Sequence, residues 1–139
     1  MTIVTVEETI AANANDVFKF LGDFGRIKVG GAITAFELEG EGVGAVRTIT
    51  MGGGQVIERL DEHDSEKLVF GYSILNEDNP LPVSNYSSRV EITANGEDAC
   101  TVNWSGTFEP KGADEAVASK VIHGIYTGGI AGTRKALGG

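Results

Sequence analysis

Six strand-like segments follow one another along the middle of this chain, most of them separated by short turns. They are residues 33–39, 45–51, 55–62, 67–75, 83–94 and 99–109. The connecting sequences include GEGVG, GGG and NGED, which are rich in turn-forming residues. Strands joined by short turns pair antiparallel, because a parallel pair needs a crossover of roughly a dozen residues or more. The sequence therefore predicts one antiparallel sheet.

A strand and two short helices are predicted before this run, and a long helix after it. Residues 2–10 are rich in Thr, Val and Ile, which favour a strand. Residues 12–25 predict a short helix and residues 26–29 a second one, while apolar spacing predicts a long helix ending at Leu137. One long helix covers only one face of a sheet. We therefore predict an α+β fold, with about seven antiparallel strands curved around the C-terminal helix.

Charge and composition argue against several classes of function. The net charge is −9 and the 11 Lys and Arg residues are scattered, whereas nucleic-acid-binding domains gather basic residues on one face. No apolar run has the length of a membrane span. The single Cys100 forms no internal disulfide, and the separated His63 and His123 form no metal motif. With no basic leader, we expect one cytoplasmic domain over residues 1–139, without nucleic-acid partner, membrane insertion, metal or cofactor.

Strand alternation predicts an acidic and a basic residue on the inner face of the sheet. In the strand after GGG, Val56, Glu58 and Leu60 share the more apolar face, so Glu58 is expected to point inward. The same reasoning points Arg47 inward from the strand before GGG. The hairpin brings the two side chains together, and a buried carboxylate needs such a partner. The pair is either a structural ion pair or a polar anchor and general base for a ligand.

Motifs from nearly the whole chain carry a family resemblance. They include DVFKFLGDFGRI, ELEGEGVGAVRTI, VNWSGTFEP and the C-terminal GIYTGGIAGTRKAL. Together they resemble the Bet v 1-like, or START-like, superfamily (SRPBCC), in its bacterial polyketide cyclase/dehydrase and lipid-transport branch. ERLDEHDSEKLVFGYSI and NYSS are also similar to the plant abscisic-acid receptors. The resemblance implies a helix-grip fold whose cavity is lined by Arg47 and Glu58, but this fold hosts many functions.

Three further strand residues are assigned to the ligand site. Tyr72 shares an apolar face with Phe70 and Ile74, so its ring is expected inside, with its hydroxyl needing a partner. Tyr86 and Ser88 share a face of the next strand. The resemblance implies a ligand contact for both, because they match the NYSS positions that contact ligand in the receptors.

The last strand gives two conflicting indications. Hydrophobicity alone places Trp104 inside. Register with the receptor family instead implies that Asn103 and Ser105 line the cavity. We assign Asn103 and Ser105 to the ligand site, which leaves Trp104 to be covered by another element or by a partner chain.

Four glycines in the predicted long helix need an explanation. They are Gly124, Gly128, Gly129 and Gly132. Each costs about 1 kcal/mol relative to Ala inside a helix. The glycines allow close packing on the sheet, mark an early end of the helix, support a dimer, let the helix shift, or leave volume for a ligand. On the last interpretation, Ile125 and Gly129 line the ligand site. The GGG turn is likewise a tight hairpin turn or a mobile lip of the cavity.

These observations favour binding of a hydrophobic small molecule, with a polar oxygen-bearing end, in an internal cavity. As an enzyme, the protein would carry out a cofactor-independent cyclisation, dehydration or isomerisation of the polyketide cyclase type. Glu58 would then be the general acid or base, and Arg47 and Tyr86 would stabilise an enolate or carboxylate. Tyr72 would orient the ligand. The alternatives are a non-catalytic carrier or sensor for lipids or isoprenoids, and a dimeric interaction module. A monomer or a homodimer is expected.

Overall fold

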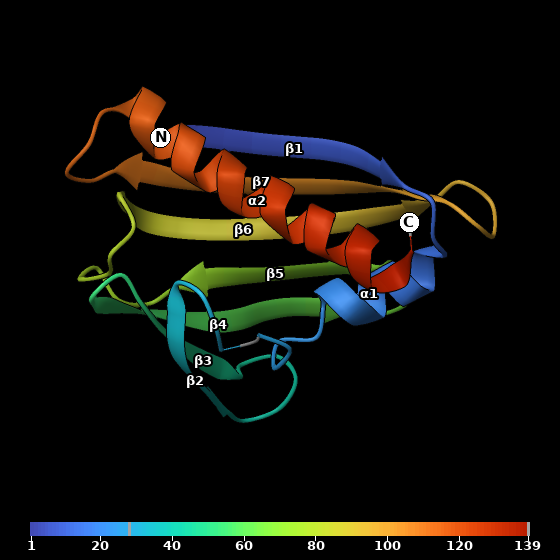
Figure 1. Cartoon of the computed structure of the whole chain (residues 1–139), viewed down its shortest axis with the longest axis horizontal. Helices are drawn as coiled ribbons and strands as arrows, with labels where there is room; N and C mark the ends of the chain where they lie inside the picture. The colour runs from blue at the N-terminus through green and yellow to red at the C-terminus, as the bar shows by residue number, and fades with distance from the viewer. Residues whose placement is uncertain (28, 139) are drawn as a thin grey trace.

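The strand-like segments form one curved, seven-stranded antiparallel sheet. The computed structural model describes residues 1–27 and 29–138 (Figure 1). The strands are β1 (Thr2–Ile10), β2 (Ile33–Glu39), β3 (Val46–Met51), β4 (Gly54–Asp64), β5 (Val69–Ile74), β6 (Val83–Ala94) and β7 (Cys100–Pro110). Their order across the sheet is β1-β7-β6-β5-β4-β3-β2. The predicted α+β architecture is confirmed; β1, β2 and β6 have the predicted boundaries, and those of the other strands differ by one or two residues.

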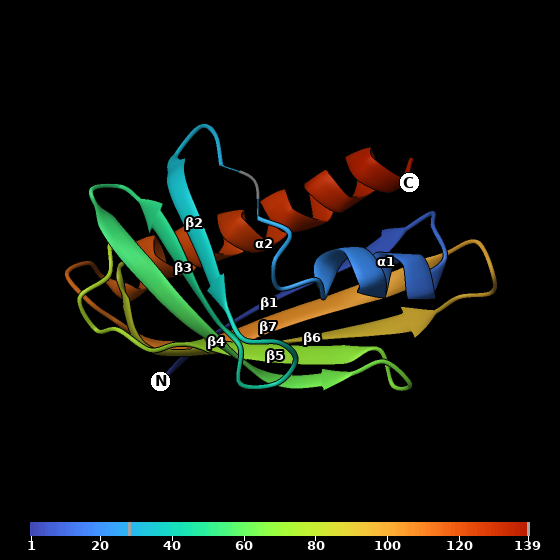
Figure 2. The ribbon, with the colours of Figure 1, turned by 90° about the horizontal axis from the view of Figure 1, so that it is seen from below.

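A long helix, α2 (Glu115–Leu137), crosses the concave face of this sheet (Figures 1 and 2). The side chain of Asp114 caps its first turn by accepting a hydrogen bond from Val117 N at 2.9 Å. Gly138 ends it with a φ of 76°, a left-handed conformation that favours glycine. The face turned to the sheet consists of Ala118, Ile122, Tyr126, Ile130 and Thr133. A neighbouring row of Val117, Val121 and Ile125 is exposed.

A short helix, α1 (Ala14–Leu21), fills the space between one end of α2 and the sheet (Figure 2). Asn13 is its N-cap, and its side chain accepts hydrogen bonds from the backbone N–H groups of Asn15 and Asp16. Gly22 ends the helix. Val17, Phe18 and Leu21 are buried against the core, which explains why an eight-residue helix is stable here.

The prediction of a second short helix over residues 26–29 is wrong for the three of these residues that the structure describes. Arg26, Ile27 and Val29 are not helical, and Lys28 lies outside the described part of the chain. A turn is closed by the hydrogen bond from Arg26 N to Asp23 O. A lone helical turn without packing partners is unstable because helix nucleation is costly.

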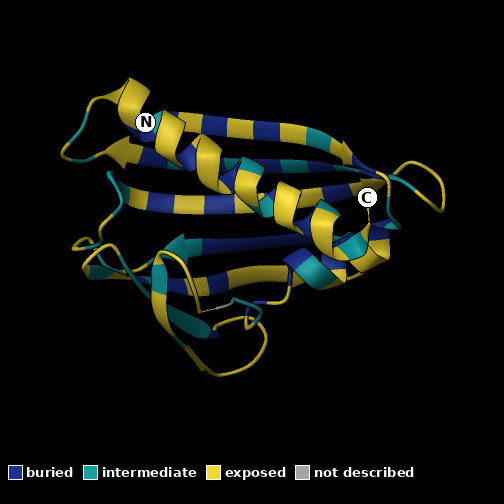
Figure 3. Cartoon of the chain, in the orientation of Figure 1, coloured by how far each residue is buried: buried dark blue, intermediate teal, exposed yellow. Residues whose placement is uncertain are grey.

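Buried residues alternate with mostly exposed ones along β1 and β6, and with partly buried ones along most of β7 (Figure 3). The inner side chains meet those of α1 and α2 in one core, whereas the outer side chains are mainly polar. Cys100 is buried in this core, as a structural thiol would be. The core therefore occupies the region between the two helices and the centre of the sheet.

The GGG sequence forms a tight hairpin turn between β3 and β4. Met51 pairs with Gly54, so Gly52 and Gly53 are the two central residues, with φ values of 57° and 77°. Two successive positive φ values define the type I′ turn that suits hairpin twist, and glycine adopts them without strain. The turn lies beside Pro80 of the β5–β6 loop, since a Cβ on Gly54 would be 3.3 Å from Pro80 Cδ.

Candidate ligand-binding cavity

A cavity of about 450 Å³ lies between the strands β3, β4 and β5, the middle of α2, and the segment that follows α1. Ligand pockets typically measure roughly 300–1,000 Å³. Its lining consists of Leu21, Arg26, Ile27, Ile33, Arg47, Ile49, Met51, Val56, Glu58, Phe70, Tyr72, Leu81, Trp104, Ile125 and Gly129. Most of these residues are apolar, and three of the described lining residues are charged.

Arg47 and Glu58 form an ion pair inside this cavity. They are directly paired across β3 and β4, and Arg47 Nε donates to Glu58 Oε1 at 2.7 Å. Their side chains are only 12% and 9% exposed. A buried carboxylate and a buried guanidinium each carry a large desolvation cost, which the pair offsets in part. The predicted inward orientation and proximity of these residues are confirmed; their role in binding or catalysis stays a prediction.

Additional contacts hold the guanidinium of Arg47 in place. Nη1 donates to the carbonyl oxygen of Phe24 at 3.3 Å, and the guanidinium carbon lies 4.0 Å from the centre of the Phe24 ring. The centre of the Tyr72 ring lies 5.5 Å from the same guanidinium carbon. Cation–π contacts of this kind favour a fixed orientation of the guanidinium. Arg47 is therefore a preorganised donor at the cavity wall.

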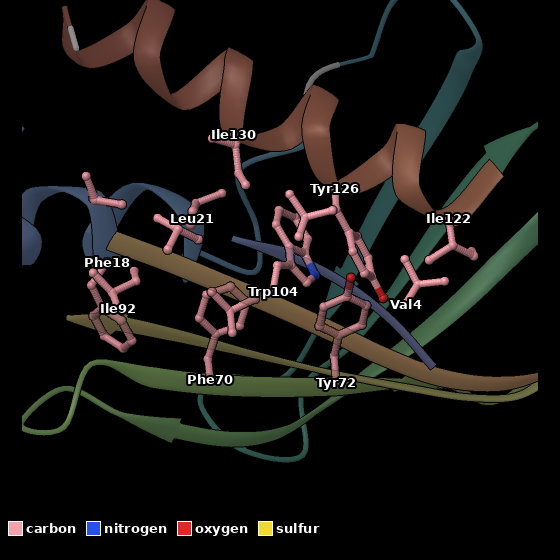
Figure 4. Close-up of a cluster of buried hydrophobic side chains, with 14 of the residues drawn as sticks. Val4, Phe18, Leu21, Phe70, Tyr72, Ile92, Trp104, Ile122, Tyr126 and Ile130 are labelled. Carbon is pink, nitrogen blue, oxygen red and sulfur yellow. The ribbon is translucent and has the colours of Figure 1, made fainter. Parts of the chain in front are cut away.

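The three tyrosines of the chain meet behind the cavity. The hydroxyls of Tyr86 and Tyr126 are 2.5 Å apart, and that of Tyr72 is 3.4 Å from Tyr86. Tyr126 also donates to Ser88 Oγ, which accepts a hydrogen bond from Trp104 Nε1 at 3.0 Å. Figure 4 shows Tyr72, Tyr126 and Trp104 converging between the sheet and α2. Of the group, Tyr72 and Trp104 reach the cavity surface.

Burial keeps these phenols protonated. Desolvation is the largest cause that raises the pKa of Tyr72, Tyr86 and Tyr126. For Tyr72, the nearby Glu58 carboxylate raises the pKa further. At neutral pH the tyrosines are therefore hydrogen-bond donors. Tyr86 and Ser88, assigned to the ligand site from sequence, point inward but serve this hydrogen-bonded group, and they are not in the cavity lining.

The assignment of Asn103 and Ser105 to the cavity is wrong. Both lie on the outer face of the sheet, where Asn103 donates to Glu7 Oε2 and the hydroxyl of Ser105 pairs with that of Thr5. They line a separate hollow of about 510 Å³ on that polar face. Trp104 points inward instead, and it is 8% exposed. The physical reason is that α2 and the core cover Trp104, so no partner chain is needed to bury it.

The glycines of α2 serve different purposes along the helix. A Cβ on Gly129 would lie 2.7 Å from Trp104 Cζ3, so this glycine is required by close packing. The indole of Trp104 stacks on the ring of Tyr126 at a centroid distance of 4.7 Å. By contrast, Gly124, Gly128 and Gly132 have open space around them. Gly129 and the 40%-exposed Ile125 line the cavity at its helix side, where the sequence places them.

Sequence reasoning missed several cavity residues. Arg26 and Ile27 come from the irregular segment after α1, and Leu81 comes from the β5–β6 loop. No periodicity marks such positions, so only the chain trace brings them to the cavity. Among residues 1–27 and 29–138, no group of His, Cys, Asp and Glu is suited to hold a metal ion. None of the described helices is long and apolar enough to cross a membrane.

A curved antiparallel sheet wrapped around a long C-terminal helix defines the Bet v 1-like helix-grip class of proteins. The chain belongs to the family described as polyketide cyclase / dehydrase and lipid transport, whose model matches residues 1–138. No curated protein matches the sequence.

Solved structures agree with this membership. The protein XoxI from Bacillus cereus superposes with a TM-score of 0.83 at 29% identity, covering 99% of this chain and 96% of the other. An uncharacterized protein from Bacillus thuringiensis gives 0.82 at 28% identity, covering 98% of both chains. Norcoclaurine synthase from Thalictrum flavum, solved with dopamine and hydroxybenzaldehyde, gives 0.75 at 20% identity, covering 95% of this chain and 83% of the other. At that identity the likeness supports the fold alone.

Proposed function

We propose that this protein binds a hydrophobic small molecule with a polar, oxygen-bearing end in the cavity between the sheet and α2. The observation that carries the proposal is the buried Arg47–Glu58 pair in the wall of an otherwise largely apolar cavity of about 450 Å³. An apolar body would displace water from the aliphatic and aromatic lining. An oxygen at one end would accept from Arg47, whose Nη2 has no protein acceptor among the described residues.

Binding is favoured over catalysis by the chemistry of the lining. Glu58 is the one carboxylate among the described lining residues, and its Oε1 already accepts from Arg47. No described histidine, and no second carboxylate, lines the cavity to complete an acid–base pair. A cyclase- or dehydrase-like reaction would have to use Glu58 with the Tyr72 phenol. The carrier or sensor function needs only the shape and polarity of the cavity.

The test uses Trp104, which is the only tryptophan of the chain and lines the cavity. The purified protein is titrated with the neutral apolar dye N-phenyl-1-naphthylamine, and energy transfer from Trp104 to the dye is recorded. We expect saturable binding by the natural protein. Val56→Phe should weaken it, because Val56 lines the cavity and the larger ring fills part of its volume.

Ile3→Phe is the matched control, since Ile3 is 67% exposed on β1 and does not line the cavity. It should bind the dye as the natural protein does. Native mass spectrometry of the purified protein shows in parallel whether a ligand occupies the cavity from the start. The proposal is overturned if no dye binds and no ligand is retained. It is equally overturned if Val56→Phe and Ile3→Phe bind the dye alike.

A further inference from the structure

Among the described residues that line the cavity, positive charges outnumber negative ones. Arg26 and Arg47 both line the cavity, and Glu58 is the one described carboxylate that does. The ion pair neutralises Arg47 and Glu58. One guanidinium therefore remains uncompensated among the described lining residues, inside a chain whose net charge is −9.

Arg26 is held in place without neutralisation. Its Nε donates to the carbonyl oxygen of Phe20 at 2.7 Å, and its guanidinium carbon lies 4.2 Å from the centre of the Phe20 ring. Neither contact is with an anion, and none of the described carboxylates forms a salt bridge with it. Both Nη atoms of Arg26 are without a protein acceptor in the described part of the chain. The Arg26 side chain therefore has a fixed orientation, and the N–H groups of both Nη atoms are available to a ligand.

Asp23 does not supply the missing negative charge. It lines grooves outside the cavity, and its Oδ1 accepts from Gly25 N at 3.1 Å. Burial is the main cause that lowers the pKa of the Arg26 guanidinium. Repulsion from Arg47 lowers this pKa further, by more than Asp23 raises it. The two guanidinium groups therefore repel each other across the cavity wall, and a bound anion would relieve this repulsion.

We propose that the cavity selects an amphipathic monoanion, with a carboxylate head between Arg26 and Arg47 and an apolar body along the aliphatic and aromatic lining. This inference rests on the proposed function and names its ligand class. Planar guanidinium groups bind carboxylates through paired, charge-assisted hydrogen bonds. A single negative charge matches the one positive charge left among the described lining residues. A doubly charged head would leave an excess charge buried, at a large desolvation cost.

The experiment compares decanoate with decanol, which share an alkyl chain and differ in the head. Each competes with N-phenyl-1-naphthylamine for the cavity, at a pH well above the pKa of the acid. Decanoate should displace the dye at a concentration about tenfold lower than decanol, or better. Arg26→Gln should remove this preference and leave decanol unaffected, whereas Arg26→Lys should keep part of it.

Lys120→Gln is the matched control for net charge. Lys120 is exposed on α2 and does not line the cavity, so its loss removes one positive charge without touching the site. The preference for decanoate should persist in this variant. Equal displacement by decanoate and decanol in the natural protein overturns the inference and leaves the proposed function intact. Absence of dye binding, with no retained ligand, overturns the proposed function itself.

Discussion

Gly129 of α2 lies so close to Trp104 of β7 that a Cβ on the glycine would come within 2.7 Å of the indole Cζ3. This contact sets how deeply the helix sits on the sheet beside the cavity. The neighbouring Gly128 is different, because a Cβ on this residue would have no other atom within 4 Å. The glycines of one helix therefore have opposite consequences for stability.

Gly129→Ala should destabilise the protein by roughly 1–3 kcal/mol, because the methyl group must displace the Trp104 ring from a packed position. Gly128→Ala should instead stabilise it by about 0.5–1 kcal/mol, since alanine is the better helix former and meets no neighbour. Urea unfolding, followed by circular dichroism, measures both variants. Equal effects of the two substitutions would contradict the packing argument.

The buried pair of Arg47 and Glu58 predicts strong coupling. Arg47→Met and Glu58→Gln should each lower the free energy of unfolding by about 3 kcal/mol, because each leaves the other partner in the wall without its counterpart. The double variant should lose much less than the sum of the two. A double-mutant cycle by denaturant unfolding gives the coupling energy. Additive losses would show that the two side chains act independently.

The three tyrosines predict a loss of stability at alkaline pH. Their pKa values are raised in the folded protein above the ordinary value of about 10 in the unfolded chain. The stabilisation is therefore fully present below about pH 10 and is lost as the pH rises above it. If all three phenols ionise only on unfolding, the free energy of unfolding falls by about 4 kcal/mol per pH unit there.

Spectrophotometric titration of the phenolate absorbance tests this expectation. The native protein should show no tyrosinate near pH 10 until it unfolds, since Tyr72, Tyr86 and Tyr126 are the only tyrosines and all are buried. Tyr126→Phe should reduce the pH dependence by about a third. Reversible ionisation of a folded tyrosine at its ordinary pKa would contradict the buried arrangement.

The β3–β4 turn predicts a contrast between two neighbouring glycines. Gly53→Ala should destabilise the protein by about 1–2 kcal/mol, because alanine resists a φ of 77°. Gly52→Asn should change stability by less than about 0.5 kcal/mol, since Asn-Gly is the favoured pair for a type I′ turn. Thermal unfolding measures both. A large loss for Gly52→Asn would argue that its contact with Pro80 matters more than turn conformation.

The spacing of apolar residues along the sequence was enough to predict which strand residues point into the core. The alternation of two residues in a strand turned Arg47, Glu58 and Tyr72 inward, and the short GGG connection set the first two opposite each other. On the last strand, the same alternation favoured Trp104, and the register taken from related proteins was misleading. Side-chain hydrophobicity was the better guide, because the burial of apolar surface is what stabilises a fold most strongly.

The composition of the cavity was decided by tertiary structure. The sequence determined the strands, the long helix and the inward ion pair, because these follow from spacing and turn chemistry between near neighbours. Arg26 reaches the cavity from an irregular segment, and Tyr86 and Ser88 were drawn into a hydrogen-bonded group with Tyr126 on α2. These contacts are between residues that lie far apart in the sequence. They depend on how the helix seats on the curved sheet, which no local pattern encodes.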